Sequence, residues 1–224
     1  PLATIAGAAT ALQSGAGLDE RTRAQLTDHI VHEAERLNDL IANLMFATRL
    51  ESGGVELNRE WASVEEIVGA GLARHRQALR SRHFQVRVPP ELPLLLVDNA
   101  MLPQVVHNLV DNALRYTSPE TPIDISAWAT DSSVIVQVAD QGPGLTDLER
   151  SRVFQRFYRG RNAEPTGDRS GIGLGLTICE GIVKAHGGRM WAEHNTPRGV
   201  AFMFSLPIDR PQPEIPAEPT EGMP

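Results

Sequence analysis

The sequence is poor in several kinds of residue. Its 224 residues include one cysteine, Cys179, and aromatic side chains make up 5% of the chain. One cysteine excludes an internal disulfide and a cysteine-rich metal site, and it fits a reducing compartment. No apolar stretch approaches the roughly 18 residues that a membrane-spanning helix needs. Because 41% of the side chains are hydrophobic, the chain can still bury a sizeable core, and we expect soluble domains.

The sequence also has no excess of positive charge. Its 21 basic and 28 acidic residues give a formal net charge of -7. A nucleic-acid-binding surface and an anionic-membrane contact both need concentrated basic residues. We therefore expect neither direct nucleic-acid binding nor membrane contact by this chain. It begins at Pro1 without the layout of a signal peptide, and we expect it to be part of a longer protein.

Residues 1–52 are predicted to form a helical hairpin. Residues Asp19 to Leu50 contain neither glycine nor proline, and their apolar residues recur at helical spacing. A shorter helix is predicted over Leu2 to Gln13, before a glycine-containing turn. Two helices alone leave such an apolar stripe uncovered, so we expect a homodimer in which two hairpins form a four-helix bundle. The alternative is that the stripe packs on the rest of the chain.

Residues 55–206 mix helix and strand signals, so the predicted fold class is α+β. The strands outnumber the βαβ units of a parallel sheet, which favours an α/β sandwich with helices on one face. We expect helices at 63–82, 100–116 and 174–185, and strands at 84–88, 94–97, 123–129, 134–139, 189–193 and 200–206, the last two as a hairpin. Residues 207–224 are rich in proline, and we expect them to be disordered.

The helix predicted at 100–116 has an unusual polar row opposite its apolar face. Gln104, Asn108, Asn112 and Arg115 share one side at helical spacing. Asparagine is a weak helix former, so two of them one turn apart inside a helix are unexpected. Amide oxygens suit Mg²⁺, and arginine suits phosphate. The row is either a metal–phosphate site or an ordinary solvated face.

Two glycine-containing segments follow this helix. Asp140–Gly144 comes directly after a predicted strand, where a carboxylate can accept a bond from an exocyclic amine and glycines admit a flat ligand. An ordinary β-turn is the alternative. Gly171–Leu176 leads into the last predicted helix, and glycine-rich backbone at a helix N-terminus favours phosphate binding.

The connection at 145–170 is long enough to be a lid over a site. Thr146 and Glu149 are predicted to cap a short helix within it. Phe154, Phe157 and Tyr158 follow, and these aromatics indicate either a hydrophobic latch or packing against a core.

Together these segments resemble the catalytic part of sensor histidine kinases, whose ATP-binding domain is shared with gyrase-type and Hsp90-type ATPases. His107–Thr117 is similar to the N box of that family, and Asp140–Gly144 is similar to its G1 box. Phe154–Arg159 is similar to the F box, and Gly171–Leu176 to the G2 box. The order, spacing and predicted context of the four motifs match the family over residues 55–206.

Two further stretches refine the resemblance. Pro1–Gly7 is similar to the segment that follows the phosphoacceptor histidine in these kinases. Residues 59–61 and 153–160 are most similar to those of potassium-sensing kinases that control potassium-uptake genes.

The resemblance implies that ATP and Mg²⁺ are the cofactors. Asp140 would accept the adenine amino group, and Asn108 and Asn112 would hold Mg²⁺ between the phosphates. Arg115 stands where the family commonly has lysine, and which phosphate it contacts is left open. These two asparagines and this arginine are the implied catalytic residues. The implied nucleotide-binding set is Asn108, Asn112, Arg115, Tyr116, Asp140, Gly142, Gly144, Arg159, Gly171, Gly173, Gly175 and Leu176.

The resemblance also implies partners and a cellular setting. The kinase would transfer the γ-phosphoryl group to a histidine and then to an aspartate of a response-regulator receiver domain. The accepting histidine would lie a few residues before Pro1, so we expect this chain to bind ATP–Mg²⁺ without phosphorylating itself. It would be the cytoplasmic domain of a membrane-anchored parent.

Two alternatives to a kinase stay open at this point. One is a non-catalytic nucleotide-binding or regulator-docking module that uses the same pocket as a switch. The other is a gyrase-type or Hsp90-type ATPase, which is disfavoured because those proteins place a water-activating glutamate where this chain has Asn108.

Overall fold

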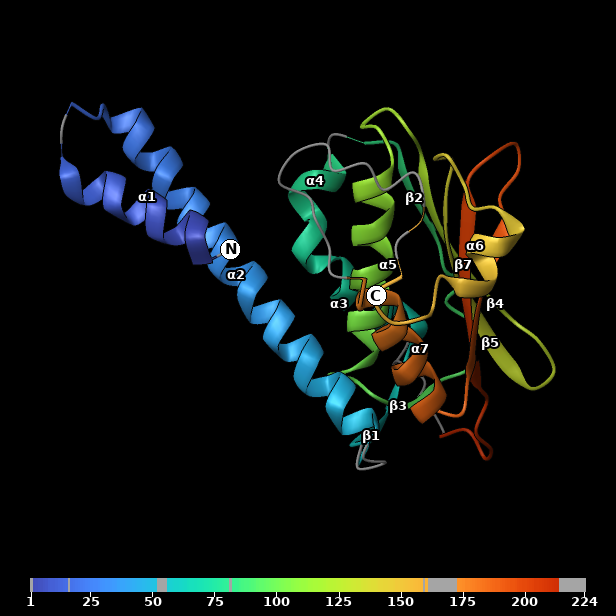
Figure 1. Cartoon of the computed structure of the whole chain (residues 1–224). Helices are drawn as coiled ribbons and strands as arrows, with labels where there is room; N and C mark the ends of the chain where they lie inside the picture. The colour runs from blue at the N-terminus through green and yellow to red at the C-terminus, as the bar shows by residue number, and fades with distance from the viewer. Residues whose placement is uncertain are drawn as a thin grey trace, which may run out of the picture. The chain divides into compact units, whose positions relative to one another are not determined.

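The computed structural model describes residues 2–15, 17–51, 56–80, 82–158, 160 and 173–213. The chain divides into two compact units, Pro1–Gly54 and Val55–Pro224 (Figure 1). None of the helices in these described ranges is long and apolar enough to cross a membrane.

The first unit is a pair of helices, α1 (Leu2–Ser14) and α2 (Glu20–Glu51), which pack against each other. Asp19 caps α2, because its Oδ1 accepts a hydrogen bond from the Thr22 N–H at 2.8 Å. The two predicted helices are therefore confirmed, with ends within one residue of the predicted ones.

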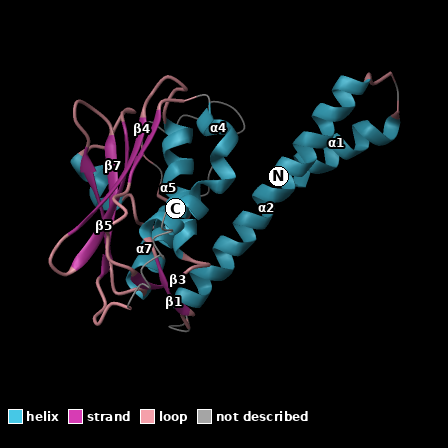
Figure 2. Ribbon diagram, turned by 180° about the vertical axis from the view of Figure 1, so that it is seen from behind, coloured by secondary structure: helices cyan, strands magenta, loops and turns pink. Residues whose placement is uncertain are grey.

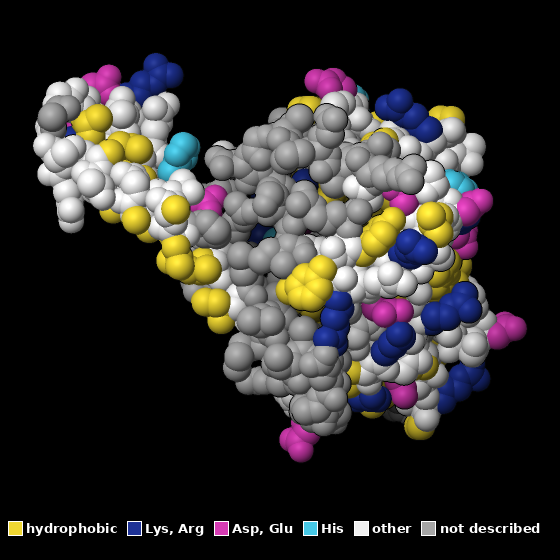
Figure 3. Space-filling model, in the orientation of Figure 1, with side chains coloured by type: hydrophobic (Ala, Val, Ile, Leu, Met, Phe, Trp, Pro, Cys, Tyr) yellow, Lys and Arg dark blue, Asp and Glu magenta, His cyan; other side chains and the backbone are white. Residues whose placement is uncertain are grey.

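Apolar side chains lie exposed on this first unit. Leu2, Val31 and Ile41 are each more than half exposed, and hydrophobic side chains gather along the hairpin in Figure 3. On the face of the second unit seen in Figure 3, Lys and Arg side chains are interspersed with Asp and Glu. The positive charge on that face is therefore not gathered into one patch.

The second unit is built on a five-stranded sheet in the order β2-β4-β5-β7-β6 (Figure 2). Strands β2 and β4 are parallel, and the other neighbouring strands are antiparallel. The last two strands form the predicted hairpin. The strands are β2 (Phe84–Arg87), β4 (Ile123–Ala129), β5 (Ser133–Asp140), β6 (Arg189–His194) and β7 (Val200–Pro207).

Helices cover one face of this sheet (Figures 1 and 2). They include α3 (Val64–Leu72), α5 (Leu102–Tyr116) and α7 (Gly175–Ala185). Helix α5 contacts α3, α7 and β5. The predicted sandwich is confirmed, because alternate residues of β4 and β5 are buried and the whole apolar face of α5 is at most 3% exposed.

The structure differs from the predicted elements at two places. The helix expected over 63–82 begins at the Ser63–Glu66 capping box but is broken by the 3-10 turn η1 (Ala73–His75) before α4 (Arg76–Arg80). Strand β1 (Arg59–Ala62) is not among the predicted strands, because three of its four residues are exposed and give no alternating pattern. It pairs antiparallel with β3 (Leu95–Asp98) in a two-stranded sheet.

The expectation of disorder from residue 207 onward is wrong for residues 207–213. Pro207 ends β7, and the Ile208 N–H donates to the Ser132 carbonyl at 3.0 Å. The Gln212 amide bonds both the N–H and the carbonyl of Leu94, at 2.9 and 3.1 Å. Residues 214–224 lie outside the described residues.

Helix α3 approaches α5 through Gly71. A Cβ at this position would lie 2.6 Å from the Val106 Cβ and 2.8 Å from the Pro103 carbonyl oxygen, both on α5. Gly69 of the same helix has open space at its Cβ position.

These two glycines give a matched pair of variants. We expect Gly71→Ala to lower the free energy of unfolding by about 1–3 kcal/mol, because a well-packed contact must open. Gly69→Ala should instead raise it by up to about 1 kcal/mol, because alanine favours the helix. Urea unfolding measures both, and equal effects of the two substitutions would contradict the packing described.

A buried histidine joins β3 to the end of α7. The Nε2 of His186 accepts the Asp98 N–H at 3.0 Å, and its Nδ1 bonds the Ile182 carbonyl at 2.8 Å. The side chain is 2% exposed. Burial lowers the pKa of His186, and the nearby charge of Arg59 lowers it further, against opposing effects of Ile182 and Asp98. The ring is therefore held in its neutral form.

Stability should depend on pH through this ring. Because the folded pKa lies below the ordinary value of 6.5, the unfolded chain binds more protons below that pH. The contribution of His186 to the free energy of unfolding is complete above about pH 6.5. It is lost as the pH falls toward the folded pKa of this ring. We expect the loss of unfolding free energy between about pH 7.5 and 5.5 to be smaller in His186→Gln, and parallel urea titration curves would contradict this.

Candidate functional site

Helix α5 presents the predicted polar row beside its buried face. Gln104, Asn108, Asn112 and Arg115 are all half-buried, neither in the core nor fully solvated. Pro103 stands in the first turn of the helix, where a missing N–H has no cost. The apolar residues between them are buried where α5 packs on the sheet and α7, and this fixes the side of α5 on which the row lies.

The start of α7 lies against this row at Asn108. The Asn108 Nδ2 is 3.5 Å from the Gly175 carbonyl oxygen. One turn further along α7, the Cys179 thiol donates to the Val105 carbonyl of α5 at 3.8 Å. Helix α7 starts at Gly175, and its N-cap residue is Leu174, whose side chain cannot accept a bond from the first N–H groups. The N-terminal end of a helix with such a cap favours an anionic ligand.

Gly173 brings the segment before α7 against the aromatic segment at 154–158. Its φ is +76°, and a Cβ there would lie 2.9 Å from the Tyr158 carbonyl oxygen. The Phe157 N–H donates to the Gly173 carbonyl at 3.0 Å, and Phe157 itself has a φ of 60°. The predicted F box and G2 box therefore meet through their main chains.

The two aromatic residues of this segment behave differently. Phe154 packs edge-on against Phe202 of β7, with ring centroids 6.4 Å apart. Phe157 is 63% exposed. Of the two interpretations of these aromatics, core packing applies to Phe154. The predicted cap of α6 (Asp147–Arg152) is confirmed, since Thr146 and Glu149 form a capping box.

The turn after β5 lies against the other end of α5. Asp140 ends the strand with its side chain buried, and its Oδ1 accepts the Gly142 N–H at 2.8 Å. A Cβ at Gly142 would lie 2.9 Å from this Oδ1, 3.0 Å from the Thr117 Cγ2 and 3.2 Å from the Tyr116 carbonyl oxygen. Only glycine therefore fits between the carboxylate and the end of α5. The neighbouring Tyr116 side chain is 44% exposed.

Burial controls the chemistry of the Asp140 carboxyl. It raises the pKa of Asp140, while hydrogen bonds from the backbone N–H groups of Gly142 and Val200 act in the opposite direction. The carboxyl is thus oriented by two fixed donors in a dry environment. Gly144 allows the turn to approach a second segment of the chain. Its φ is +73°, and a Cβ there would lie 3.0 Å from the Gly199 carbonyl oxygen.

Arg115 is engaged within its own helix. Its guanidinium contacts the Asp111 Oδ2 at 2.7 Å, one turn earlier. A phosphate near Arg115 would share the guanidinium with this carboxylate or displace it. Two members of the predicted set, Arg159 and Gly171, lie outside the described residues, as do residues 161–170 of the expected lid.

Several residues around the site carry no sequence signal of their own. Arg82 donates to the Thr117 hydroxyl at 2.7 Å and to the carbonyls of Thr117 and Leu114 at 3.1 and 3.2 Å. It thereby caps the C-terminal end of α5 beside Gly142. The turn between β6 and β7 bonds the main chain after β5 through Asn195 and Arg198. Both sets of contacts join segments far apart in the sequence.

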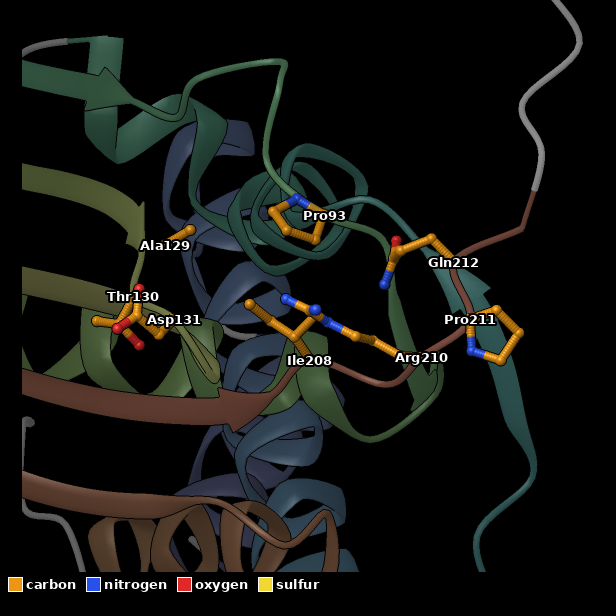
Figure 4. Close-up of a pocket in the computed structure, with 8 residues that line it drawn as sticks. All are labelled: Pro93, Ala129, Thr130, Asp131, Ile208, Arg210, Pro211 and Gln212. Carbon is orange, nitrogen blue, oxygen red and sulfur yellow. The ribbon is translucent and has the colours of Figure 1, made fainter.

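A pocket elsewhere in the second unit is unrelated to these residues. It is lined by Ala129–Asp131 at the end of β4 and the following turn, and by Pro93, Ile208 and Arg210–Gln212 (Figure 4). None of the predicted site residues lines it. Among the described residues, no group of three or more His, Cys, Asp or Glu side chains is placed to hold a metal ion.

Comparison with known families assigns the second unit. Residues 97–210 match the family model described as "Histidine kinase-, DNA gyrase B-, and HSP90-like ATPase". The chain belongs to this family. The match includes α5, the turn after β5 and the start of α7, so the three neighbouring segments described above are parts of one ATPase domain.

Its relatives are sensor histidine kinases. The chain is 32% identical over 208 residues to Sensor protein KdpD of Clostridium acetobutylicum, covering 92% of this chain and 23% of that protein. Among solved structures, a mycobacterial sensor histidine kinase, MprB, is 29% identical with a TM-score of 0.58, covering 66% of this chain and 97% of that chain. The histidine kinase ThkA in complex with the response regulator TrrA shares the fold, at 23% identity, a TM-score of 0.66, and coverage of 93% and 58%.

The contacts of Arg82 predict a measurable effect on the domain. We expect Arg82→Met to lower the free energy of unfolding by about 1–3 kcal/mol, because buried carbonyls and the Thr117 hydroxyl lose a charged donor. Exposed Arg80 provides the control, and Arg80→Met should change stability by no more than about 0.5 kcal/mol. Urea unfolding of both variants checks this, and indistinguishable midpoints would show that the cap is dispensable.

Proposed function

We propose that this chain is the kinase core of a two-component sensor kinase. It binds ATP with Mg²⁺ and transfers the γ-phosphoryl group to a histidine, from which the group passes to an aspartate of a response-regulator receiver domain. The observation that carries the proposal is that one helix, α5, lies against both the turn after β5 and the start of α7. Asp140 and Gly142 lie at its C-terminal end, and Gly175 lies at Asn108. About eight residues of helix separate these points, or about 12 Å, which suits an extended nucleoside triphosphate.

The adenine would lie at Asp140. A buried carboxylate with fixed orientation accepts a hydrogen bond from the exocyclic amine. The missing side chain of Gly142 lets the turn lie close against this carboxylate and the end of α5. Tyr116, with an exposed face at the end of α5, would line the same pocket. Gly144 would hold the same turn in place through its close approach to Gly199.

The phosphates would lie between α5 and the start of α7. Gly173, Gly175 and Leu176 bring main-chain N–H groups and the positive end of the α7 dipole to this place. Arg115 adds positive charge once its guanidinium is shared between Asp111 and the phosphates, or released from Asp111. Arg159 and Gly171 belong to the same proposed set.

Asn108 and Asn112 would hold Mg²⁺ through their amide oxygens. The Nδ2 of Asn108 faces the Gly175 carbonyl, which leaves its Oδ1 as an acceptor for the ion. Mg²⁺ ordinarily keeps several waters and binds phosphate oxygens alongside one or two protein ligands, so two amide oxygens on one helix face fit it. The ion would neutralise phosphate charge, while the protein supplies position and orientation.

The hairpin of α1 and α2 is proposed as the dimerisation unit. Its exposed apolar side chains at Leu2, Val31 and Ile41 are what a second hairpin would cover in a four-helix bundle. Residues 1–52 would thus be the dimerisation and phosphotransfer segment, with 55–206 as the catalytic domain. The likeness in fold to a kinase solved with a response regulator supports a receiver domain as the partner.

The similarity to KdpD is the basis for a more specific proposal about the signal that the parent protein serves. It covers 92% of this chain, so we propose a KdpD-like core with a part in potassium-responsive gene control. The chain spans 23% of the length of that relative. The same proposal places the core on the cytoplasmic side of a membrane-anchored parent.

Two substitutions test the site at its two ends. We expect Asp140→Ala to weaken ATP binding by roughly 10- to 100-fold, with or without Mg²⁺, because the base loses its acceptor. Asn112→Ala should remove most of the gain in affinity that Mg²⁺ provides and leave Mg²⁺-free binding nearly unchanged. Calorimetry with ATP measures both, and exposed Asp131, in the β4–β5 turn, provides the control Asp131→Ala.

Activity is tested in the chain extended at its N-terminus to include the accepting histidine. Labelled ATP should yield acid-labile phosphate on the extended wild type and on Asp131→Ala. It should yield little on Asp140→Ala or Asn112→Ala. Phosphoryl transfer that survives both substitutions would contradict the proposed mechanism.

A further inference from the structure

The turn between β6 and β7 contacts the main chain at Asp140 from three of its residues. The Asn195 Nδ2 donates to the Asp140 carbonyl at 2.8 Å, and the Arg198 Nε donates to the Gln141 carbonyl at 2.7 Å. Gly199 approaches so closely that a Cβ there would lie 2.0 Å from the Asp140 carbonyl oxygen. One turn thus holds both peptide groups that follow β5.

The turn is itself well ordered by internal bonds. The Asn195 N–H donates to the Gly199 carbonyl at 3.1 Å, and the Asn195 Oδ1 accepts the Thr196 N–H at 2.9 Å. Asn195 therefore uses one side-chain atom to shape its own turn and the other to hold Asp140.

Asp140 is paired with Ile123 of β4 on one side, and the turn at 195–199 holds its carbonyl on the other side. The pairing of β5 with β7 ends at Ala139 and Ala201, one residue before Asp140. Beyond that point the chain enters a turn with Gly142 and Gly144, which permit many backbone conformations. On the β7 side, the Asn195 amide takes the place of the next ladder bond, while Val200 donates to the Asp140 carboxylate.

We infer that the turn at 195–199 determines the recognition of the nucleotide base, with Asn195 as the positioning residue that sets the direction of the Asp140 carboxylate. The inference rests on the proposed function. Asn195 contacts Asp140 and not the ligand, so it acts through that carboxylate. A fixed carboxylate accepts from the 6-amino group of adenine and faces the 6-carbonyl oxygen of guanine, which it repels. The turn therefore sets the preference for adenine over guanine.

The chain offers a substitution that separates the two bonds of Asn195. Asn195→Asp keeps an oxygen for the Thr196 N–H and removes the donor to Asp140, whereas Asn195→Ala removes both. We expect each variant to bind ATP–Mg²⁺ about 3- to 30-fold more weakly and to lose at least half of the ratio of ATP to GTP affinity. In the N-terminally extended chain, KM for ATP should rise while kcat at saturating ATP stays within about twofold.

Controls and a milder variant keep the result interpretable. Thr196→Ala, at an exposed position in the same turn, should behave as wild type. If both Asn195 variants fail to fold by urea unfolding, Arg198→Ala replaces them, because exposed Arg198 holds the next carbonyl and its loss should shift the ATP to GTP ratio in the same direction.

The outcomes separate this inference from the proposed function. If wild type binds no ATP–Mg²⁺, the proposed function fails. If wild type binds and Asp140→Ala weakens binding, but folded turn variants keep both the affinity and the ATP to GTP ratio, then only the role of the turn is wrong. A fall in kcat with an unchanged KM would also overturn it, because the effect would then lie at the phosphates.

Discussion

The packing of α5 into the helix layer is the constraint on which the site depends. Six apolar residues of this helix are almost completely buried against the sheet and the neighbouring helices. Because a helix turns by a fixed angle per residue, burying one face also sets the side on which the polar row lies. Asn108, Asn112 and Arg115 are therefore placed by residues that never approach a ligand. The close approach of Gly71 of α3 to Val106 is part of the same packing.

The two ends of α5 are held by different means. At Asn108 the helix meets α7 through a side-chain amide and a main-chain carbonyl, with Cys179 beside them. At Tyr116 and Thr117 it meets a glycine turn through van der Waals contact, and Arg82 satisfies its last carbonyls. The -7 charge of the chain is no obstacle to a polyphosphate in such a place, because main-chain N–H groups, amides and a few arginines act locally.

Much of the fold could be predicted from periodicity, and the rest could not for a definite reason. The apolar spacing of 102–113 and the alternation in 123–139 are local patterns, and the structure confirms the helix and both strands. Strand β1 has no such pattern, because it pairs with only one neighbour and three of its four residues are exposed. Among the site residues, Asp140 and Asn108 carry motif signals, but Arg82 and Asn195 do not. Their roles come from contacts across 35 and 55 residues, which no local spacing records.

Cys179 has a practical consequence for studying this molecule. It is the one cysteine of the chain, it is completely buried, and burial raises the pKa of its thiol to about 12. A thiol reacts with alkylating reagents as the thiolate, so the Cys179 thiol is unreactive toward them at neutral pH in the folded protein. A cysteine introduced at an exposed position would therefore be the single reactive thiol. Fluorescent or spin labels could then report on residues 145–158 or on the hairpin without first removing the native residue.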